Sequence, residues 1–190
     1  MSVNPLKIQE DMHTEKTTDR NANTPSQKQH DTSNLGIAST SSASFDLVMS
    51  QLGIANQHAF NDYQTQQWQE AVIERQQLAV LTCEVDYYQE YLQHYGQQGA
   101  SFMMVSVALA MKNVCFHSEC FLAHFGQNRL VVLIKGGDQN SVQNIAENLC
   151  SAVKNTRTEH KHSQVDNIVT ISVGFSSDSP LHNDDLRKPG

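Results

Sequence analysis

The distribution of apolar residues along the chain predicts strands that form a hairpin near its middle. Residues 78–86 and 130–134 are nearly continuous apolar runs, which are typical of strands buried in a sheet. Residues 121–125 are also strand-like, so residues 126–128 become the turn of a hairpin. The first strand ends in carboxylates, and we expect the tip of the hairpin to lie beside Glu84.

Apolar residues that recur at spacings of three and four predict helices between these strands. The expected helices span residues 45–49, 56–77, 87–95, 101–114 and 138–155. Asp138 is the expected N-cap of the last helix. A polar loop at 156–166 and a final strand at 167–175 follow.

This order of elements predicts an α+β fold with a ferredoxin-like palm, in which helices pack on one side of a mostly antiparallel sheet. The folded domain is expected to span residues 45–178, followed by a short C-terminal stub at 179–190. Residues 1–44 contain no aromatic residue and few apolar ones. Such a segment buries too little apolar surface to offset the entropy of ordering, so we expect a disordered N-terminal tail.

Composition excludes several classes of function. The formal net charge is −7 and the 13 Lys and Arg residues are scattered, which argues against a nucleic-acid partner. Apolar runs are too short for a membrane span and the N-terminus lacks a secretion signal, so we expect a cytoplasmic protein without membrane contact. Cysteines lie in or beside apolar segments without disulfide spacing, which predicts reduced, buried thiols.

Several short motifs occur in the order found in GGDEF domains of diguanylate cyclases. Residues 124–130, HFGQNRL, resemble the RYGGDEF signature, and residues 52–60, LGIANQHAF, resemble TGLPNRRAF. Residues 84–88, EVDYY, resemble the DxDxF strand end, and Tyr95-Gly96 matches the YGH step. Residues 169–174, VTISVG, resemble the closing TxSxG strand. The chain therefore resembles a GGDEF domain, although many functional positions differ.

The resemblance implies a metal position that this chain has altered. In the family, magnesium assists attack by the 3′-hydroxyl of one GTP on another, and magnesium requires hard, anionic oxygen ligands. Glu84 stands at the first metal-binding position, but Asn128 and Arg129 replace the acidic residues of the turn. We therefore expect no bound metal, no cofactor and no catalytic residue. The remnant signature turn is Gly126, Gln127, Asn128, Arg129 and Leu130.

The resemblance also implies that contacts to the guanine base are lost. Leu92 stands where the family has an asparagine, and Ser101 stands where it has an aspartate that accepts from the base. A site that recognises guanine by hydrogen bonds to the polar edge of the base distinguishes it poorly from other ligands once the hydrogen-bonding side chains are gone. Residues 117–120 occupy the inhibitory RxxD motif, and His117 and Cys120 replace its charged residues.

Other groups of polar residues suggest different chemistry. Cys115, His117, Cys120 and His124 invite a zinc-site interpretation, but alternation along a strand would point them to opposite faces, so we favour structural burial. His160 and His162 are expected to face solvent from a loop.

A pair of carboxylates at the end of the first strand suggests a hydrolase. Glu84 and Asp86 would share one face of that strand, as in some phosphodiesterases, but no hydrolase motif accompanies them.

The sequence favours a catalytically inactive GGDEF-like domain that acts as a protein-interaction module in cyclic-di-GMP signalling. Its partner is another protein or a second copy of the chain in a dimer. The expected interface is the remnant nucleotide groove, which includes Glu84, Asp86, Tyr87, Leu92 and Ser101. Two alternatives stay open: a sensor that binds GTP or cyclic-di-GMP without turnover, and a weak cyclase that acts only beside an intact partner.

Overall fold

The computed structural model describes residues 45–179. The expectations for the tail at 1–44 and for nearly all of the stub at 179–190 lie outside the described residues. A helical segment at residues 45–51 begins the described chain and confirms the short helix expected there.

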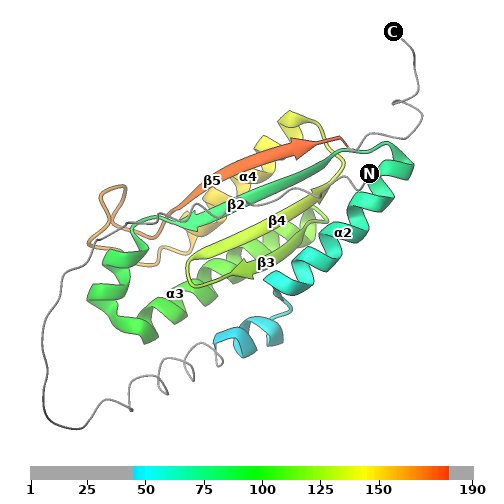
Figure 1. Ribbon diagram of the computed structural model, residues 1–190. Helices are drawn as coiled ribbons and strands as arrows, with labels where there is room; N and C mark the ends of the chain where they lie inside the picture. The colour runs from blue at the N-terminus through cyan, green and yellow to red at the C-terminus, as the bar shows by residue number, and fades with distance from the viewer. Residues whose placement is uncertain (1–44, 180–190) are drawn as a thin grey trace, which may run out of the picture.

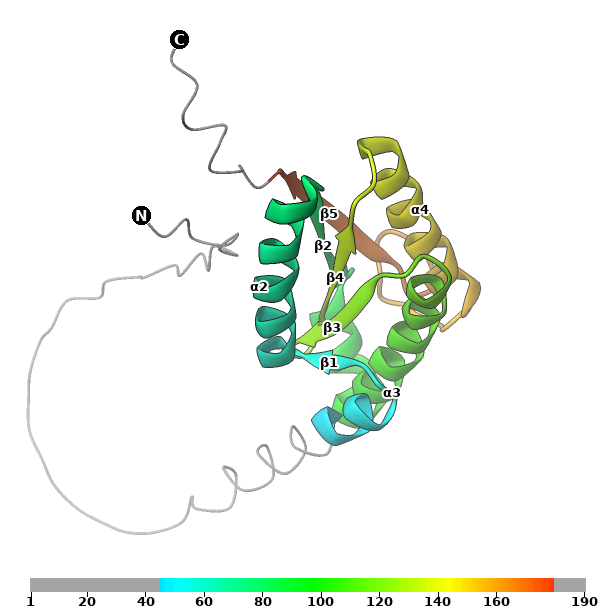
Figure 2. The same cartoon turned by 90° about the vertical axis from the view of Figure 1, so that its right-hand side faces the viewer.

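One mixed sheet organises the domain, with strands in the order β1-β3-β4-β2-β5 (Figure 1 and Figure 2). The central strands are β2 (Leu78–Val85) and β4 (Arg129–Lys135), which pair antiparallel. β3 (Phe121–Phe125) and β5 (Ile171–Asp178) flank them, also antiparallel, and the short β1 (Ala55–Asn56) pairs parallel with β3. The expected α+β palm with a mostly antiparallel sheet is confirmed.

Helices cover both faces of the sheet, so the expectation of helices on one side is wrong (Figure 2). α2 (Gln57–Glu74) lies on one face, and α3 (Tyr88–His117) and α4 (Gln139–Asn155) lie on the other. The reason is that successive strand residues point to opposite faces and both sets are apolar. Val131 packs in the cluster under α2, whereas Val132 packs in the larger cluster under α3 and α4.

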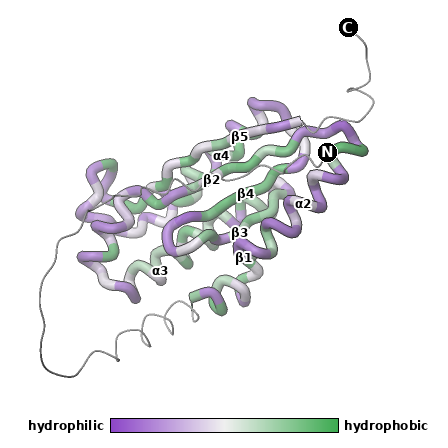
Figure 3. Tube along the Cα trace, in the orientation of Figure 1, coloured by the Kyte–Doolittle hydropathy of each residue, from purple (hydrophilic) through white to green (hydrophobic). Residues whose placement is uncertain are grey.

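Hydropathy follows this layering along the chain. Strands β2 and β4 are hydrophobic across the middle of the sheet, whereas the turn between β3 and β4 is hydrophilic (Figure 3). The turn therefore lies at a polar edge of the sheet, where its side chains are accessible to solvent and to a ligand.

α2 contacts the sheet mainly through two aromatic side chains, Phe60 and Tyr63, and the ring of Tyr63 stacks on Phe121 of β3 with centroids 4.1 Å apart. Phe60 is fully buried, and its ring meets Phe125 edge to face with centroids 5.2 Å apart. Trp68, the largest side chain of this helix, is only half-buried, whereas Gln64 and Gln67 are buried. The apolar contact beneath α2 is consequently small.

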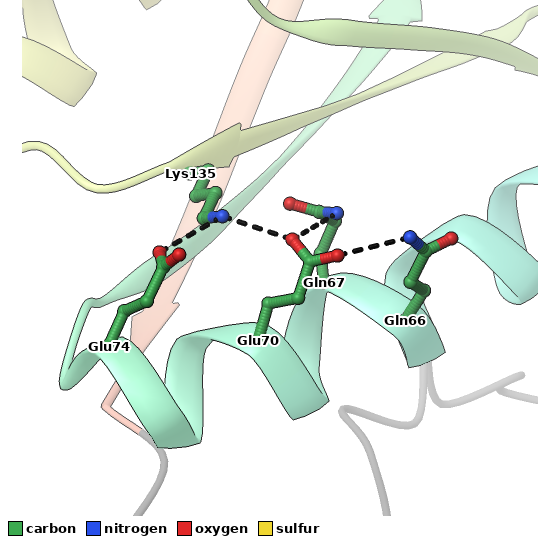
Figure 4. A network of polar contacts seen from close by, with 5 residues as sticks. All are labelled: Gln66, Gln67, Glu70, Glu74 and Lys135. Atoms are coloured by element: carbon green, nitrogen blue, oxygen red, sulfur yellow. Dashed lines mark hydrogen bonds and ion pairs between the residues drawn. The ribbon is translucent and has the colours of Figure 1, made fainter.

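A polar network joins the C-terminal half of α2 to the end of β4 (Figure 4). The Nζ of Lys135 lies 3.1 Å from a carboxylate oxygen of Glu70 and 3.0 Å from one of Glu74. Gln66 and Gln67 donate to Glu70, and these bonds together with Lys135 lower the pKa of Glu70. Because water and salt screen such exposed pairs, the network orients α2 more than it stabilises the fold.

α3 is kinked at Gly96, whose φ of 70° and ψ of 173° are not helical. The two predicted helices at 87–95 and 101–114 correspond to its two halves, and glycine tolerates the positive φ at the junction. α3 is the one helix of residues 45–179 that is long and apolar enough to cross a membrane. Its buried residues, which include Met103 and Met111, pack in the main core.

The last predicted elements are present with shifted boundaries. Asp138 caps α4 as expected, because its side chain accepts a 2.8 Å bond from the backbone N–H of Ser141. β5 starts at Ile171 rather than at residue 167, since Val169 N–H bonds to the carbonyl of Thr158 in the preceding loop.

Candidate functional site at the turn between β3 and β4

The turn between β3 and β4 lies beside the end of β2, which confirms the expected hairpin. Gly126 and Gln127 are exposed, and Gly126 adopts a φ of 67°. The backbone N–H of Val85 donates a 3.1 Å bond to the carbonyl of Asn128. This bond ties the turn to β2 and brings the next residue, Arg129, into register with Glu84.

Glu84 and Arg129 form an ion pair across the two strands. Nη2 and Nε of the guanidinium lie 2.5 Å and 2.7 Å from the same oxygen, Oε1, of the carboxylate. Both side chains are partly exposed, at 45% for Glu84 and 40% for Arg129. The carboxylate expected at a metal position therefore has its charge balanced by a fixed cation.

Asp86 has different partners, so it does not form a pair with Glu84. Its two carboxylate oxygens accept bonds from the hydroxyls of Thr170, at 2.5 Å, and Ser172, at 2.6 Å. Its backbone N–H also bonds to the carbonyl of Thr170. Asp86 follows the last residue of β2 and fastens that end of the strand to β5.

Tyr87 and the loop after α4 meet through a buried histidine that the sequence placed in solvent. His160 is fully buried, and its Nε2 lies 3.0 Å from the carbonyl of Tyr87, a residue with a positive φ of 54°. The ring of His160 also meets Tyr91 edge to face. His162 is exposed as expected, but its ring stacks on His94 with centroids 3.3 Å apart. No local pattern signals these contacts.

A cavity of about 1150 Å³ opens next to the turn. Its walls come from the helical segment 45–51, the N-terminus of α2, α3 and the turn itself. The lining includes apolar and uncharged polar side chains, among them Phe45, Asn56, Ser101, Phe102, His124 and Gln127. Of the predicted groove residues, only Ser101 joins Gly126 and Gln127 in lining this cavity.

Leu92 lies elsewhere. It is half-buried and packs against the main core, and it does not line the cavity. The expectation that Leu92 offers an open apolar contact in the groove is therefore wrong. Leu130, at the end of the signature turn, is likewise a core residue with 1% exposure.

His124 is buried at the wall of the cavity with a ring nitrogen that lacks a hydrogen-bond partner. Its Nδ1 lies 3.9 Å from Oδ1 of the more exposed Asp46, too far for a hydrogen bond. Burial lowers the pKa of His124, and the carboxylate of Asp46 opposes this shift. The sequence indicated His124 as the first residue of the signature match and as a rejected zinc ligand, but it did not indicate that the segment at 45–51 lies beside it.

We expect the domain to be less stable at pH 5.5 than at pH 7.5, in part because of His124. Its lowered pKa means that the unfolded chain binds the proton more readily than the folded one. The stability that neutral His124 contributes to the folded state is fully present above the pKa of about 6.5 that the side chain has in the unfolded chain. It is lost as the pH falls toward the lower pKa of His124 in the folded state. Tm measured across this range should drop less for His124→Gln. His58→Gln, which alters an exposed histidine on α2, should keep the full drop, and an unchanged drop in His124→Gln would contradict the assignment.

The four residues weighed as a zinc site are not all brought together, and the strand alternation expected for them does not apply to the first two. The side chains of Cys115 and Cys120 are hydrogen-bonded to each other. Cys115 and His117 belong to α3 rather than to a strand. Cys115 is buried in the core, His117 is exposed, and its Nδ1 lies 2.7 Å from the carbonyl of Asn113. Cys120 is half-buried. Within residues 45–179, no group of three or more His, Cys, Asp or Glu side chains is arranged to hold a metal ion.

Thiol burial is as expected for two of the cysteines. All four are free, with Cys83 and Cys115 buried and Cys120 and Cys150 half-buried. Burial raises the pKa of Cys83 to about 12, which makes its thiol unreactive at neutral pH.

The mixed sheet, its hairpin turn and the adjoining cavity define an α+β domain of the palm type. Residues 48–188 match the family described as "Diguanylate cyclase, GGDEF domain". The chain belongs to the GGDEF family, whose members are domains of cyclic-di-GMP signalling. Comparison with curated protein sequences gives no match.

Solved GGDEF domains share this fold at low sequence identity. The GGDEF domain of DgcB from Caulobacter crescentus, in complex with c-di-GMP, is 20% identical with a TM-score of 0.59, covering 67% of this chain and 74% of that one. The GGDEF domain of FimX from Pseudomonas aeruginosa is 21% identical with a TM-score of 0.56, covering 73% and 80%. SiaD from Pseudomonas aeruginosa, in complex with its activator SiaC, is 14% identical with a TM-score of 0.58, covering 80% and 63%.

Proposed function

We propose that this chain is a GGDEF domain without cyclase activity that acts in the cytoplasm by binding a protein partner in cyclic-di-GMP signalling. The observation that carries the proposal is the ion pair between Glu84 and Arg129. A guanidinium occupies the position beside the carboxylate where a catalytic cation would bind.

This arrangement does not fit a magnesium ion. Magnesium prefers several anionic or water oxygens in an octahedron, and the turn supplies an amide and a guanidinium. A fixed positive charge a few ångströms from a divalent cation disfavours its binding by an amount on the order of several kcal/mol at an effective dielectric near 20. Asp86 already accepts hydroxyl hydrogen bonds on both carboxylate oxygens, from Thr170 just before β5 and from Ser172 within it.

The side of the site that would read guanine supports the same proposal. Ser101 lines the cavity, but it stands in place of an anionic acceptor, and Leu92 packs on the core without a hydrogen-bonding group. Polar groups of a base left without partners cost binding free energy. Loss at both the metal and the base positions argues for a role in binding rather than catalysis.

We expect the purified chain to form no cyclic-di-GMP from GTP and magnesium. The reason is the combined loss of metal ligands and base contacts, and chromatography of the products measures the outcome. An active GGDEF domain assayed in parallel provides the positive control. Product above the level of a protein-free sample would overturn the proposal, and product only after mixing with an intact cyclase would favour the weak-cyclase alternative.

One observation favours a second candidate, a nucleotide sensor without turnover. The cavity of about 1150 Å³ adjoins the turn and is large enough for a nucleotide-sized ligand. In this role Arg129 would release Glu84 and pair with phosphate oxygens directly. Thermal shift with GTP, GDP and cyclic-di-GMP separates the candidates. A magnesium-independent shift that Arg129→Ala abolishes indicates the sensor, and no shift with any nucleotide indicates the protein-binding module.

A further inference from the structure

The outer face of α3 carries an apolar stripe that nothing in residues 45–179 covers. We define the α3 stripe as Phe102, Leu109 and Phe116, whose exposures are 67%, 45% and 78%. The opposite face of the same helix is buried, with Met103, Val107 and Met111 in the main core. Most large apolar side chains of the domain are buried, so three that line up on one helix mark a contact surface.

The spacing of the stripe is that of a helix-pairing seam. Its members are seven residues apart, and positions seven apart return to nearly the same side of an α-helix. Over 14 residues the stripe is about 21 Å long. Val105, three residues after Phe102 and four before Leu109, is half-buried and packs against the main core.

The stripe is also symmetric about its centre, and this symmetry indicates the partner. Leu109 lies midway between the two phenylalanines. In a twofold interface each surface must be complementary to itself, so that residue i meets residue j and j meets i. If two α3 helices pack antiparallel with the axis at Leu109, each Phe102 meets the other chain's Phe116 and the two Leu109 side chains meet each other.

The scarcity of charged residues around the α3 stripe supports a second copy of the chain as the molecule that covers it. The chain carries a net charge of −7, so two copies repel each other over most of their surface. From residue 97 to 117 the only Lys, Arg, Asp or Glu is Lys112, and its Nζ is engaged by the carbonyl of Leu52. The stripe is therefore a surface where two acidic chains can approach without like charges meeting.

The helical segment at 45–51 widens the surface beside the stripe. Leu47 and Val48 are 59% and 39% exposed, and Val48 lines the same cavity as Phe102 and Val105. A stable dimer buries about 800 Å² on each partner, more than a single helix face of this length supplies. The segment therefore adds apolar area beside α3, next to Phe102 and Val105.

We propose that this chain forms a twofold homodimer through antiparallel packing of its α3 stripes. The proposal does not depend on the absence of cyclase activity, since the stripe lies outside the Glu84 and Arg129 pair.

The first test is the mass of the full chain in solution. Sedimentation velocity between about 1 and 100 µM should show the mass of two chains of 21.2 kDa each. Leu109→Glu should raise the dissociation constant at least tenfold, because two carboxylates would face each other across the axis. Ile73→Glu, which changes a 77% exposed side chain on α2, should leave the dimer intact. A parent chain that is monomeric throughout, or a dimer unaffected by Leu109→Glu with the fold retained, would overturn the proposal.

The second test reads the register of the two helices. Leu109→Cys should form an intermolecular disulfide with itself under mild oxidation. Phe102→Cys and Phe116→Cys should each crosslink poorly alone and efficiently when the two variants are mixed. The parent chain, treated identically, reports any crosslinking through its own cysteines. Equal crosslinking of all three single variants would indicate non-specific association and contradict the symmetric arrangement.

Discussion

A chain that carries Gln127→Gly, Asn128→Asp and Arg129→Glu is expected to bind magnesium and still make no cyclic-di-GMP. Arg129 directly opposes Glu84 in the register of β2 and β4, so this change places two carboxylates opposite each other. Without a cation they repel, as like charges across strands do. Tm should fall below that of the parent in a chelator and rise as magnesium is added.

The expected rise follows from linkage between binding and folding. A ligand at one hundred times its dissociation constant stabilises the folded state by about 2.7 kcal/mol. Turnover should stay absent, because Ser101 and Leu92 still lack the groups that would hold the base. Leu130 is left unchanged, since it is 1% exposed in the main core and a larger side chain would overpack it.

The matched control is the double variant Gln127→Gly and Asn128→Asp, which retains Arg129 and should show no magnesium response. A triple variant that ignores magnesium would mean that Glu84 is not at a metal position. Appreciable cyclic-di-GMP formation would mean that the base contacts matter less than the altered turn.

Replacing Phe60 by alanine is expected to lower the free energy of unfolding by about 3–5 kcal/mol. The ring is fully buried between α2 and the sheet and meets both Phe125 and Phe121. Its neighbours in this smaller cluster are mostly strand residues held in register by the sheet, so they collapse only partly into the space left by the ring.

Urea denaturation measures this loss. Ile73→Ala, on the same helix but 77% exposed, should change the free energy of unfolding by less than about 0.5 kcal/mol. A loss below about 1 kcal/mol for Phe60→Ala would show that α2 contributes little to the cooperative unit.

The sequence predicted the positions of the strands more accurately than the arrangement of the helices on the two faces of the sheet. The apolar runs at 78–86 and 130–134 became β2 and β4, because only a buried strand accommodates such continuous apolar character. Because both faces of these strands are apolar, the same runs imply that both faces of the sheet are covered. They do not indicate which helix covers which face. α2 was placed wrongly because its buried face includes Gln64 and Gln67, which weaken the amphipathic pattern.

The candidate site was predictable only where strand pairing defines it. A turn beside the end of β2 follows from the order of elements, and so does the proximity of Arg129 to Glu84. The direct ion pair depends on a register that a one-residue shift would destroy. Leu92, His124 and His160 were misplaced or missed because their burial depends on segments distant in the sequence, which local patterns do not encode.

The small apolar contact beneath α2 has a consequence for how the native domain opens. Local opening costs least where few apolar contacts are broken, and the bonds that tie α2 to β4 through Lys135 are exposed to water. We therefore expect amide hydrogens of α2 to exchange with solvent faster than those of β2, through partial openings in which this helix detaches from the sheet. Amide hydrogens of β2, which pairs with both β4 and β5, are expected to exchange only when the whole sheet unfolds.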